Sequence, residues 1–515
     1  MTFPNVAFVR PEIANVLPLY TAIRDCISGQ DRIKKAGKTY LPQPNPDDTS
    51  FENQKRYEAY KNRALFYNVT GRTVNGLVSL VFSKPIDKDI PTILEGVDKD
   101  ATGEGLSMSQ QAHKMLAFAI SYARYGVYVD YPTTEGIVTV KDMTDGNIKP
   151  TVNLVAPHHV INWRTMEIGS QVVYSKIVIA EIYPFADDGF EIKNSCQFRV
   201  YELEGLNIEG GIAKENDKVM AHRVKVSLWR EPNPSVWDGV NVPKKKTYRK
   251  DDNTEFYLQR ADGTYFDRIP FSFGGAENND SAVDIPVMYD MAAINIAHYR
   301  NSADYEEASF VMGQPTIWAS GLTENWLNTV LGGKVRLGSL GGVALPEGGQ
   351  MGILQMQPNT MPFEGMGHKE KQMLQLGAKL VENKTVQRTA TEANQDEVTN
   401  NSILANIANN VSDVVEWAFR TAAQFVSTDE IEVKYRLNTD FDISKYSPEQ
   451  RAQVIKEWQG GALTFEEMRS VLRKSGVATE KDEDAKKKID AERAAEIEAL
   501  NANTPNDGLN NDQNT

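Results

Sequence analysis

Apolar residues recur at helical spacing in the first 125 residues of the chain. The stretches with this spacing are residues 17–27, 51–67, 73–82 and 106–125. Each of them predicts a helix with one apolar face. We expect Gly126 to follow the last helix as its C′ residue, because glycine is the residue most often found at that position.

Shorter runs in which apolar and polar residues alternate follow, from about residue 137 to residue 271. Examples are VVYSKIVIAEIY and QFRVYEL, and Gly, Asn and Asp separate such runs. A period of two is typical of strands that bury one face. This region is therefore predicted to be an antiparallel, β-rich domain.

A second helical region is predicted over residues 284–312. Asp284 is its expected N-cap, and Pro286 falls in the first turn, where proline is tolerated. Its apolar stripe consists of Met288, Ala292, Ile296, Tyr299, Ala303 and Phe310. Because Arg300, Asp304 and Glu307 lie on the other side, the helix has two different faces.

Glycine-rich sequence breaks this pattern from residue 313 to residue 360, which predicts a small β-containing insertion. A helix over 363–380 follows, and then the polar stretch ENKTVQRTA. Thr389 and Glu392 form a capping box for a long helix. Its apolar stripe is the clearest periodic signal in the chain: Leu404, Ile407, Ala408, Val411, Val415, Ala418, Ala422 and Phe425.

The C-terminal region is predicted to be mainly helical. The alternating IEVKYRL favours a strand, residues 447–450 open a helix that ends at the glycine pair 460–461, and Thr464 with Glu467 opens another. Residues 501–515 contain too few apolar side chains to order themselves. The order of elements predicts an α+β fold.

Composition limits the function of this 515-residue chain. No apolar run approaches the length of a membrane span, and the N-terminus lacks the pattern of a secretion signal. Cys26 and Cys196 are far apart, so we expect two buried thiols and no disulfide framework. The formal charge of −14 argues against a protein that grips DNA tightly. This negative charge is compatible with DNA that slides along an acidic protein surface, because that surface repels the phosphates.

Two fragments resemble nucleotide-binding motifs but are incomplete. Gly37 to Thr39 end like a phosphate-binding loop, but Arg32 stands where the first glycine belongs. Gly103 and Gly105 begin a dinucleotide fingerprint, but Met108 replaces its third glycine. We therefore expect no nucleotide cofactor.

Two further candidates favour structural roles. His158 and His159 are adjacent, and in a strand they would point to opposite faces with no third ligand at metal spacing. Asp440 and Asp442 are more simply turn-forming caps than a catalytic carboxylate pair. No catalytic set of residues remains, so we expect no enzyme, no metal and no cofactor.

Several phrases, taken in order, resemble tailed-bacteriophage portal proteins over most of the chain. They are YLP with RYEAYKNRALFYNVTGRTVNGLVSLVFSKP, SYARYGVYVDYP, IPVMYDMAAINIAHYRNSADYEEA, RTATEANQDE, and NTDFD with GALTFEEMRSVLRKSGV. The resemblance implies an elongated subunit with a wing, a two-helix stem, a clip and a crown. It assigns residues 1–283 to the N-terminal wing, 284–312 to the first stem helix, 313–362 to the clip, 363–380 to the second stem helix, 381–388 to a channel loop, 389–428 to a long wing helix, 429–500 to the crown and 501–515 to a disordered tail.

The resemblance also implies a function. Portal proteins form a ring, commonly a dodecamer, at one capsid vertex, and double-stranded DNA passes through it during packaging and ejection. The expected partners are other copies of the chain, the terminase large subunit, head-to-tail adaptor proteins, a capsid or scaffolding protein and non-specific DNA, with no membrane. The expected location is the virion, after assembly in the host bacterial cytoplasm.

Basic residues in and beside the polar break are the candidate DNA contacts. Lys384 and Arg388, with Lys379 just before them, would repeat around a ring as a basic girdle. The alternative is an ordinary exposed loop.

Two other functions stay open from the sequence. One is a structural head-to-tail adaptor ring that is not the portal, which would normally lack the order of stem, clip and stem. The other is a phosphate-handling enzyme built around Gly37 to Thr39, which binding or hydrolysis of ATP would reveal.

Overall fold

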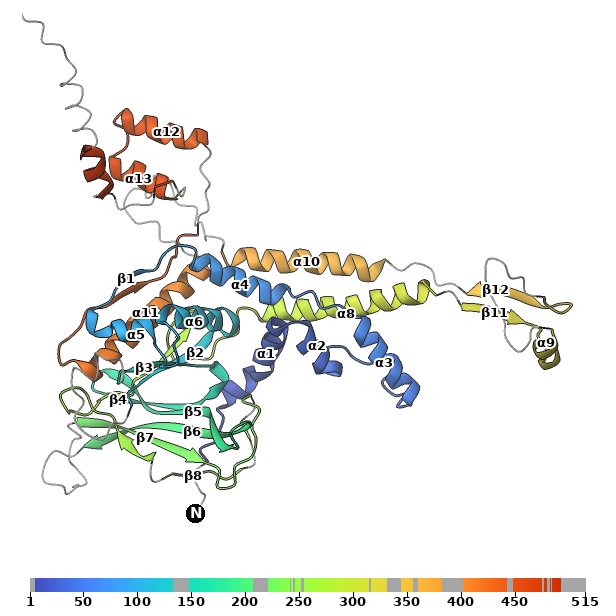
Figure 1. Cartoon of the computed structure of the whole chain (residues 1–515), viewed down its shortest axis with the longest axis horizontal. Helices are drawn as coiled ribbons and strands as arrows, with labels where there is room; N and C mark the ends of the chain where they lie inside the picture. Colours follow the sequence, from blue (N-terminus) through green and yellow to red (C-terminus); the bar gives the residue numbers. More distant parts are fainter. Residues whose placement is uncertain are drawn as a thin grey trace, which may run out of the picture. The chain divides into compact units, whose positions relative to one another are not determined.

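The computed structural model confirms the predicted α+β class. It describes residues 5–132, 148–206, 221–240, 242–243, 246–251, 254–314, 316–330, 344–354, 360–381, 402–441, 448–474, 477–478, 482 and 484–491. The chain divides into two compact units, Met1–Thr439 and Asp440–Thr515 (Figure 1).

Helices form the start of the first unit. They are α1 (Pro11–Ser28), α2 (Gln30–Ala36), η1 (Gly37–Thr39), α3 (Phe51–Arg63), α4 (Val69–Val81), η2 (Thr92–Leu94), α5 (Glu95–Lys99) and α6 (Met108–Tyr122). Ser50 caps α3, and Ser107 with Gln110 forms a capping box for α6.

The expectation that Gly126 follows α6 as its C′ residue is wrong. Ala123 ends the helix instead, in the left-handed conformation with φ of 58°. Gly126 lies inside the strand that follows, where an added Cβ would stand 2.7 Å from the Phe271 ring. Glycine is therefore used there for close packing.

Two antiparallel sheets follow, as the alternating pattern predicts. The first has the order β10-β2-β3, with β2 (Arg124–Asp130), β3 (Thr151–Val155) and β10 (Phe271–Gly275). The second has the order β4-β5-β6-β7-β8, and β9 also pairs with β7. Its strands are β4 (Val160–Ile168), β5 (Gln171–Asp187), β6 (Ile192–Leu206), β7 (Ala221–Arg230), β8 (Arg249–Lys250) and β9 (Phe256–Tyr257). The 3-10 turn η3 (Pro157–His159) connects the two sheets along the chain.

Aromatic and apolar side chains bury the contact between the sheets. The Trp163 ring lies 5.5 Å from Phe273 and the Tyr174 ring 5.6 Å from the same residue. Cys26 and Cys196 are both buried and free, as expected, and burial raises the pKa of each thiol to about 12.

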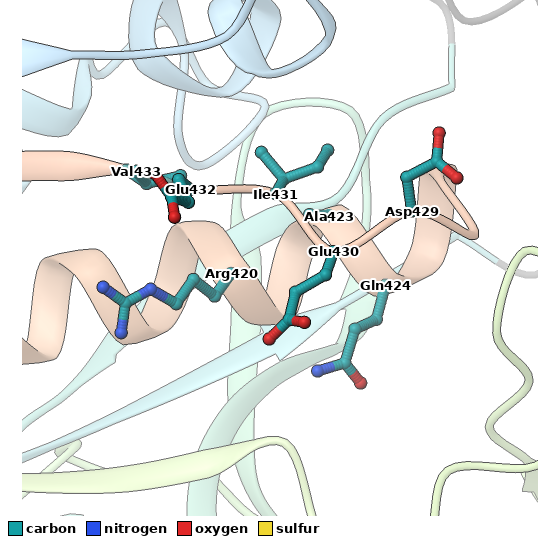
Figure 2. Close-up of a pocket in the computed structure, with 8 residues that line it drawn as sticks. All are labelled: Arg420, Ala423, Gln424, Asp429, Glu430, Ile431, Glu432 and Val433. Atoms are coloured by element: carbon teal, nitrogen blue, oxygen red, sulfur yellow. The ribbon is translucent and has the colours of Figure 1, made fainter.

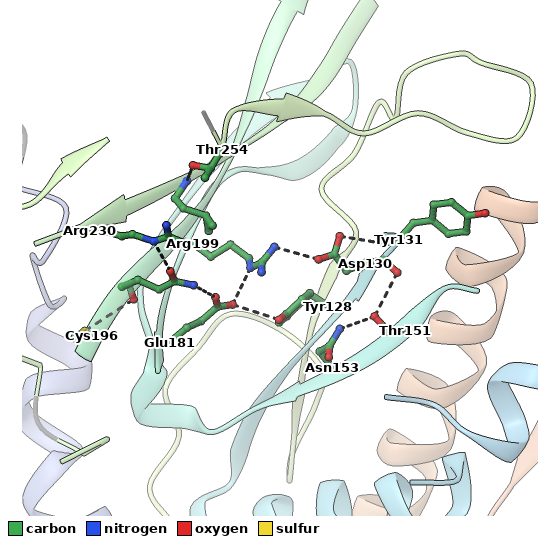
Figure 3. Close-up of polar contacts among 12 residues, drawn as sticks. Tyr128, Asp130, Tyr131, Thr151, Asn153, Glu181, Cys196, Arg199, Arg230 and Thr254 are labelled. Atoms are coloured by element: carbon green, nitrogen blue, oxygen red, sulfur yellow. Dashed lines mark hydrogen bonds and ion pairs between the residues drawn. The ribbon is translucent and has the colours of Figure 1, made fainter. Parts of the chain in front are cut away.

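A charged network also joins the two sheets (Figure 3). Arg199 on β6 donates to Glu181 on β5 at 2.8 Å and to Asp130 on β2 at 3.1 Å. Tyr128 and Gln197 each donate to the same Glu181 carboxylate, at 3.2 and 3.1 Å. One guanidinium therefore balances two carboxylates that are largely shielded from water.

The long helix α11 (Ile403–Val426) packs against α6, β2 and β10. Every position of its predicted apolar stripe is buried, from Leu404 to Phe425. Ser402 caps it by accepting from the Ala405 amide at 3.1 Å, whereas the predicted capping box at Thr389 and Glu392 lies outside the described residues. After α11, β13 (Lys434–Arg436) pairs antiparallel with β1 (Asp87–Asp89), so the predicted strand is confirmed.

A groove of about 650 Å³ lies between the end of α11 and the segment that leads to β13 (Figure 2). Its lining consists of Arg420, Ala423, Gln424, Asp429, Glu430, Ile431, Glu432 and Val433. The Arg420 guanidinium is already paired with Glu416 on its own helix, 3.3 Å away. The groove is lined by the carboxylates of Asp429, Glu430 and Glu432, and among its lining residues no side-chain nucleophile lies beside a general base.

The second unit contains the predicted helical hairpin. α12 (Pro448–Gln459) and α13 (Phe465–Lys474) pack together, and the Trp458 and Phe465 rings lie 6.1 Å apart. Gly461 between them has φ of 77°, and Thr464 with Glu467 forms the predicted capping box. Residues 429–439, which the resemblance assigned to the crown, belong to the first unit.

Candidate functional site

The candidate site is a pair of antiparallel helices with a small hairpin between them in the chain. α8 (Tyr289–Met312) and α10 (Met361–Lys379) lie side by side (Figure 1). Tyr305 near the end of α8 contacts Phe363 at the start of α10, with ring centroids 5.8 Å apart. At the opposite end the Met291 side chain lies beside Gly377.

The predicted start of α8 at Asp284 is wrong, because the helix begins at Tyr289 without a side-chain cap. The buried Arg124 explains why the helix begins later in the chain than predicted. Its guanidinium donates to the carbonyl of Ser281 at 2.6 Å and to that of Ala282. These bonds hold the preceding backbone against β2, so the chain turns into the helix only after Pro286.

The polar side of α8 packs against the N-terminal helices. Tyr60 donates to Asp304 at 2.6 Å, and Arg63 forms an ion pair with Glu307. Arg300 donates to the carbonyl of Tyr40 at 2.7 Å. The predicted polar face is therefore a contact within the chain.

Asn295 fixes the same helix to α4 from a fully buried position. Its side-chain oxygen accepts from the Thr70 amide at 3.2 Å and from the Thr70 hydroxyl at 2.9 Å. Its amide donates to the carbonyl of Tyr67 at 2.8 Å.

We expect Asn295→Ala to lower the free energy of unfolding by about 2 to 3 kcal/mol, because it leaves the buried amide and hydroxyl of Thr70 without their Asn295 partner. Urea denaturation measures the change. Asn301→Ala, on the same helix but not buried, is the control and should shift the stability by about 0.5 kcal/mol or less. Equal effects of the two substitutions would contradict the role of Asn295.

His298 joins α8 to α10. Its Nε2 atom lies 3.2 Å from Glu370 Oε1, and its imidazole is almost completely buried. Glu370 is thereby directed toward α8 and away from the outer face of its own helix.

Apolar side chains are exposed on the helix pair. Phe363 is 60% and Leu374 69% exposed on α10, and Phe310 near the end of α8 is 43% exposed. An α-helix turns by about 100° per residue, so Phe363 and Leu374, eleven residues apart, lie within about 20° of each other around the axis. They form one apolar flank of α10.

The segment between the helices contains the predicted β structure. β11 (Thr316–Ser320) pairs antiparallel with β12 (Gln350–Leu354), and α9 (Glu324–Thr329) is capped by Thr323. Trp318 and Ile353 remain largely exposed on this two-stranded sheet. Two strands alone are marginally stable in water, so this hairpin needs a neighbour to cover it.

Of the predicted DNA contacts, the structure places Lys379 alone. It is the last residue of α10 and is exposed. Lys384 and Arg388 lie outside the described residues, so their place in a channel stays a prediction.

The incomplete nucleotide motifs form ordinary turns. Gly37 to Thr39 is a 3-10 turn, and the amides of Gly103 and Gly105 each donate to Asp100 at 2.9 Å. A carboxylate of the chain therefore occupies the position beside these amides that a phosphate would need.

The adjacent histidines lie in a 3-10 turn, so the prediction that they stand in a strand is wrong. Their rings contact each other with centroids 4.3 Å apart, and His159 Nε2 lies 2.8 Å from the carbonyl of Gly239. Burial lowers the pKa of His158 to about 3 and also lowers that of His159. Within the described ranges no group of His, Cys, Asp or Glu side chains could hold a metal ion.

Comparisons with known proteins give two likenesses. Residues 287–426, which include α8, α10 and α11, match the profile of a family described as "Domain of unknown function (DUF4055)". A solved structure described as "Neck of empty GTA particle computed with C6 symmetry" contains a similar chain, with a TM-score of 0.36 and 10% identity over 82% of this chain and 93% of that chain.

No curated protein sequence matches the chain. Among helices in the described part of the chain, none is both long and apolar enough to cross a bilayer.

Proposed function

We propose that the chain is a portal-type subunit of a tailed phage or phage-like particle. It assembles into a ring at one capsid vertex, commonly of twelve copies in the family it resembles, and the ring conducts double-stranded DNA during packaging and ejection. Terminase and head-to-tail adaptors would bind the ring at the hairpin between α8 and α10. The ring would hydrolyse no nucleotide itself.

One observation carries this proposal: a braced helix pair, with a hairpin too small for a core of its own, exposes apolar side chains along its length. Exposed apolar patches mark surfaces that another protein covers. In a ring, the flank of one subunit packs against a different flank of the next subunit, and the rotation closes. Such packing would cover the apolar flank of α10 in every subunit.

The mass in solution tests the proposal. Sedimentation velocity over a range of protein and salt concentrations should show a species many times the subunit mass of 57.5 kDa. A monomer under all these conditions would contradict the proposal. Binding of ATP by the same sample would favour the enzyme alternative.

A further inference from the structure

A stripe of polar and basic residues runs along α10, on the side opposite α8. His368, Lys371, Gln375 and Lys379 form this α10 stripe, and all four are exposed. Their spacing of three or four residues places them on one helix face. The buried Met373 and Gly377, which lies beside Met291 of α8, are on the other side of the helix.

The two lysines of the α10 stripe have no carboxylate partner among the described residues. Glu370, next to Lys371 in sequence, is directed toward His298 of α8 at 3.2 Å. Glu364, one turn before His368, lies 3.0 Å from the Thr360 hydroxyl at the helix start. The nearby carboxylates are thus used elsewhere, which leaves the lysine ammonium groups available to an external anion.

The position of the α10 stripe relative to the apolar flank suits a ring. Leu374 lies about 60° from Lys371 around the helix axis, because three residues turn the helix by about 300°. If Leu374 and Phe363 face the neighbouring subunit, the stripe faces to one side of that contact. Because rotation repeats the subunit around the ring, the stripes of all subunits would lie side by side along one wall of the ring.

We propose that the α10 stripe contacts the phosphates of duplex DNA inside the ring, an inference that rests on the proposed portal-type function. Lys371 and Lys379 are eight residues apart, which places them about 12 Å apart along the helix. Each subunit would therefore supply two tiers of positive charge. The chain has a formal charge of −14, so these two rows of lysines would attract DNA phosphates locally within an otherwise acidic surface.

Such contacts have a defined character. Single lysines attract phosphates without reading bases, so binding should depend on salt and not on sequence. Weak, exchangeable contacts of this kind hold a duplex near the wall and still let it slide.

The test uses purified rings and a fluorescent linear duplex of mixed sequence. Binding is measured by anisotropy from about 50 to 200 mM salt for the wild type and for Lys371→Gln with Lys379→Gln. We expect the double variant to bind about tenfold more weakly at the lowest salt and to show a shallower dependence of binding on salt, because fewer counterions are released. Lys38→Gln with Lys55→Gln, in η1 and α3, removes the same charge elsewhere and should leave binding unchanged.

A covalently closed circular duplex is the second probe, because a preformed ring cannot be threaded onto it. It should compete poorly with the linear duplex. Equal competition, or an equal loss of binding in the two lysine double variants, would place DNA on the outside of the ring and overturn the inference. Unchanged binding by Lys371→Gln with Lys379→Gln would overturn it as well, while rings in that sample would leave the portal-type function standing. A wild type that forms no rings would overturn both.

Discussion

Replacing Arg199 by Met should lower the free energy of unfolding by about 3 kcal/mol, because it leaves two shielded carboxylates without their cation. Arg199 bridges Glu181 and Asp130, whose side chains are only 15% and 22% exposed (Figure 3). Chemical denaturation at neutral pH measures the loss. Arg164→Met, at an exposed position of β4, should change stability by about 0.5 kcal/mol or less.

The pH dependence of this loss follows from Asp130. Desolvation by burial raises the pKa of Asp130, and the neighbouring Arg199 opposes that rise. Without Arg199 the pKa of Asp130 should rise further, so the folded variant should bind a proton more tightly than the unfolded chain does. Lowering the pH therefore favours the folded variant. The deficit of Arg199→Met relative to the wild type should be smaller at about pH 5 than at about pH 7.5. A deficit that grows on acidification would contradict this account.

The second large effect concerns assembly. Phe363→Glu with Leu374→Glu should convert rings to monomers, because each burial of such a side chain contributes about 2 kcal/mol and each introduced carboxylate would be desolvated. Both positions are exposed in the subunit, so its fold should survive. Sedimentation reports the assembly, and circular dichroism the fold.

The matched control is Phe190→Glu with Ile192→Glu, at another exposed apolar site near the turn between β5 and β6. It adds the same charge and should leave the rings intact. Rings that survive substitution of Phe363 and Leu374 would show that the apolar flank of α10 is not a subunit contact.

Periodicity predicted the elements that bury a regular face. The stripe from Leu404 to Phe425 is the clearest case, because all of its positions face one core. The strand that contains Tyr435 was also predicted, although its partner β1 was not. The capping box at Thr464 was predicted correctly from local sequence, because its donor and acceptor are only three residues apart.

Predictions failed where a distant contact decides the local structure. The start of α8 depends on Arg124, more than 150 residues earlier in the chain, so no local signal at Asp284 could reveal it. The roles of Asn295 and His298 depend on partners on other helices. In the α10 stripe, sequence reasoning named Lys379 but not Lys371 as a candidate DNA contact, since the availability of Lys371 depends on where Glu370 points. The one signal present in the sequence was the helical spacing of Lys371 from Gln375 and Lys379.

Electron microscopy of the purified wild-type chain tests the central claim most directly. End-on views should show a closed ring of identical subunits around an open centre, because the apolar flank of α10 and the hairpin would be covered by neighbouring copies. Fields of separate subunits or of closed dimers without a central opening, at concentrations where the chain is folded, would contradict the portal-type assignment.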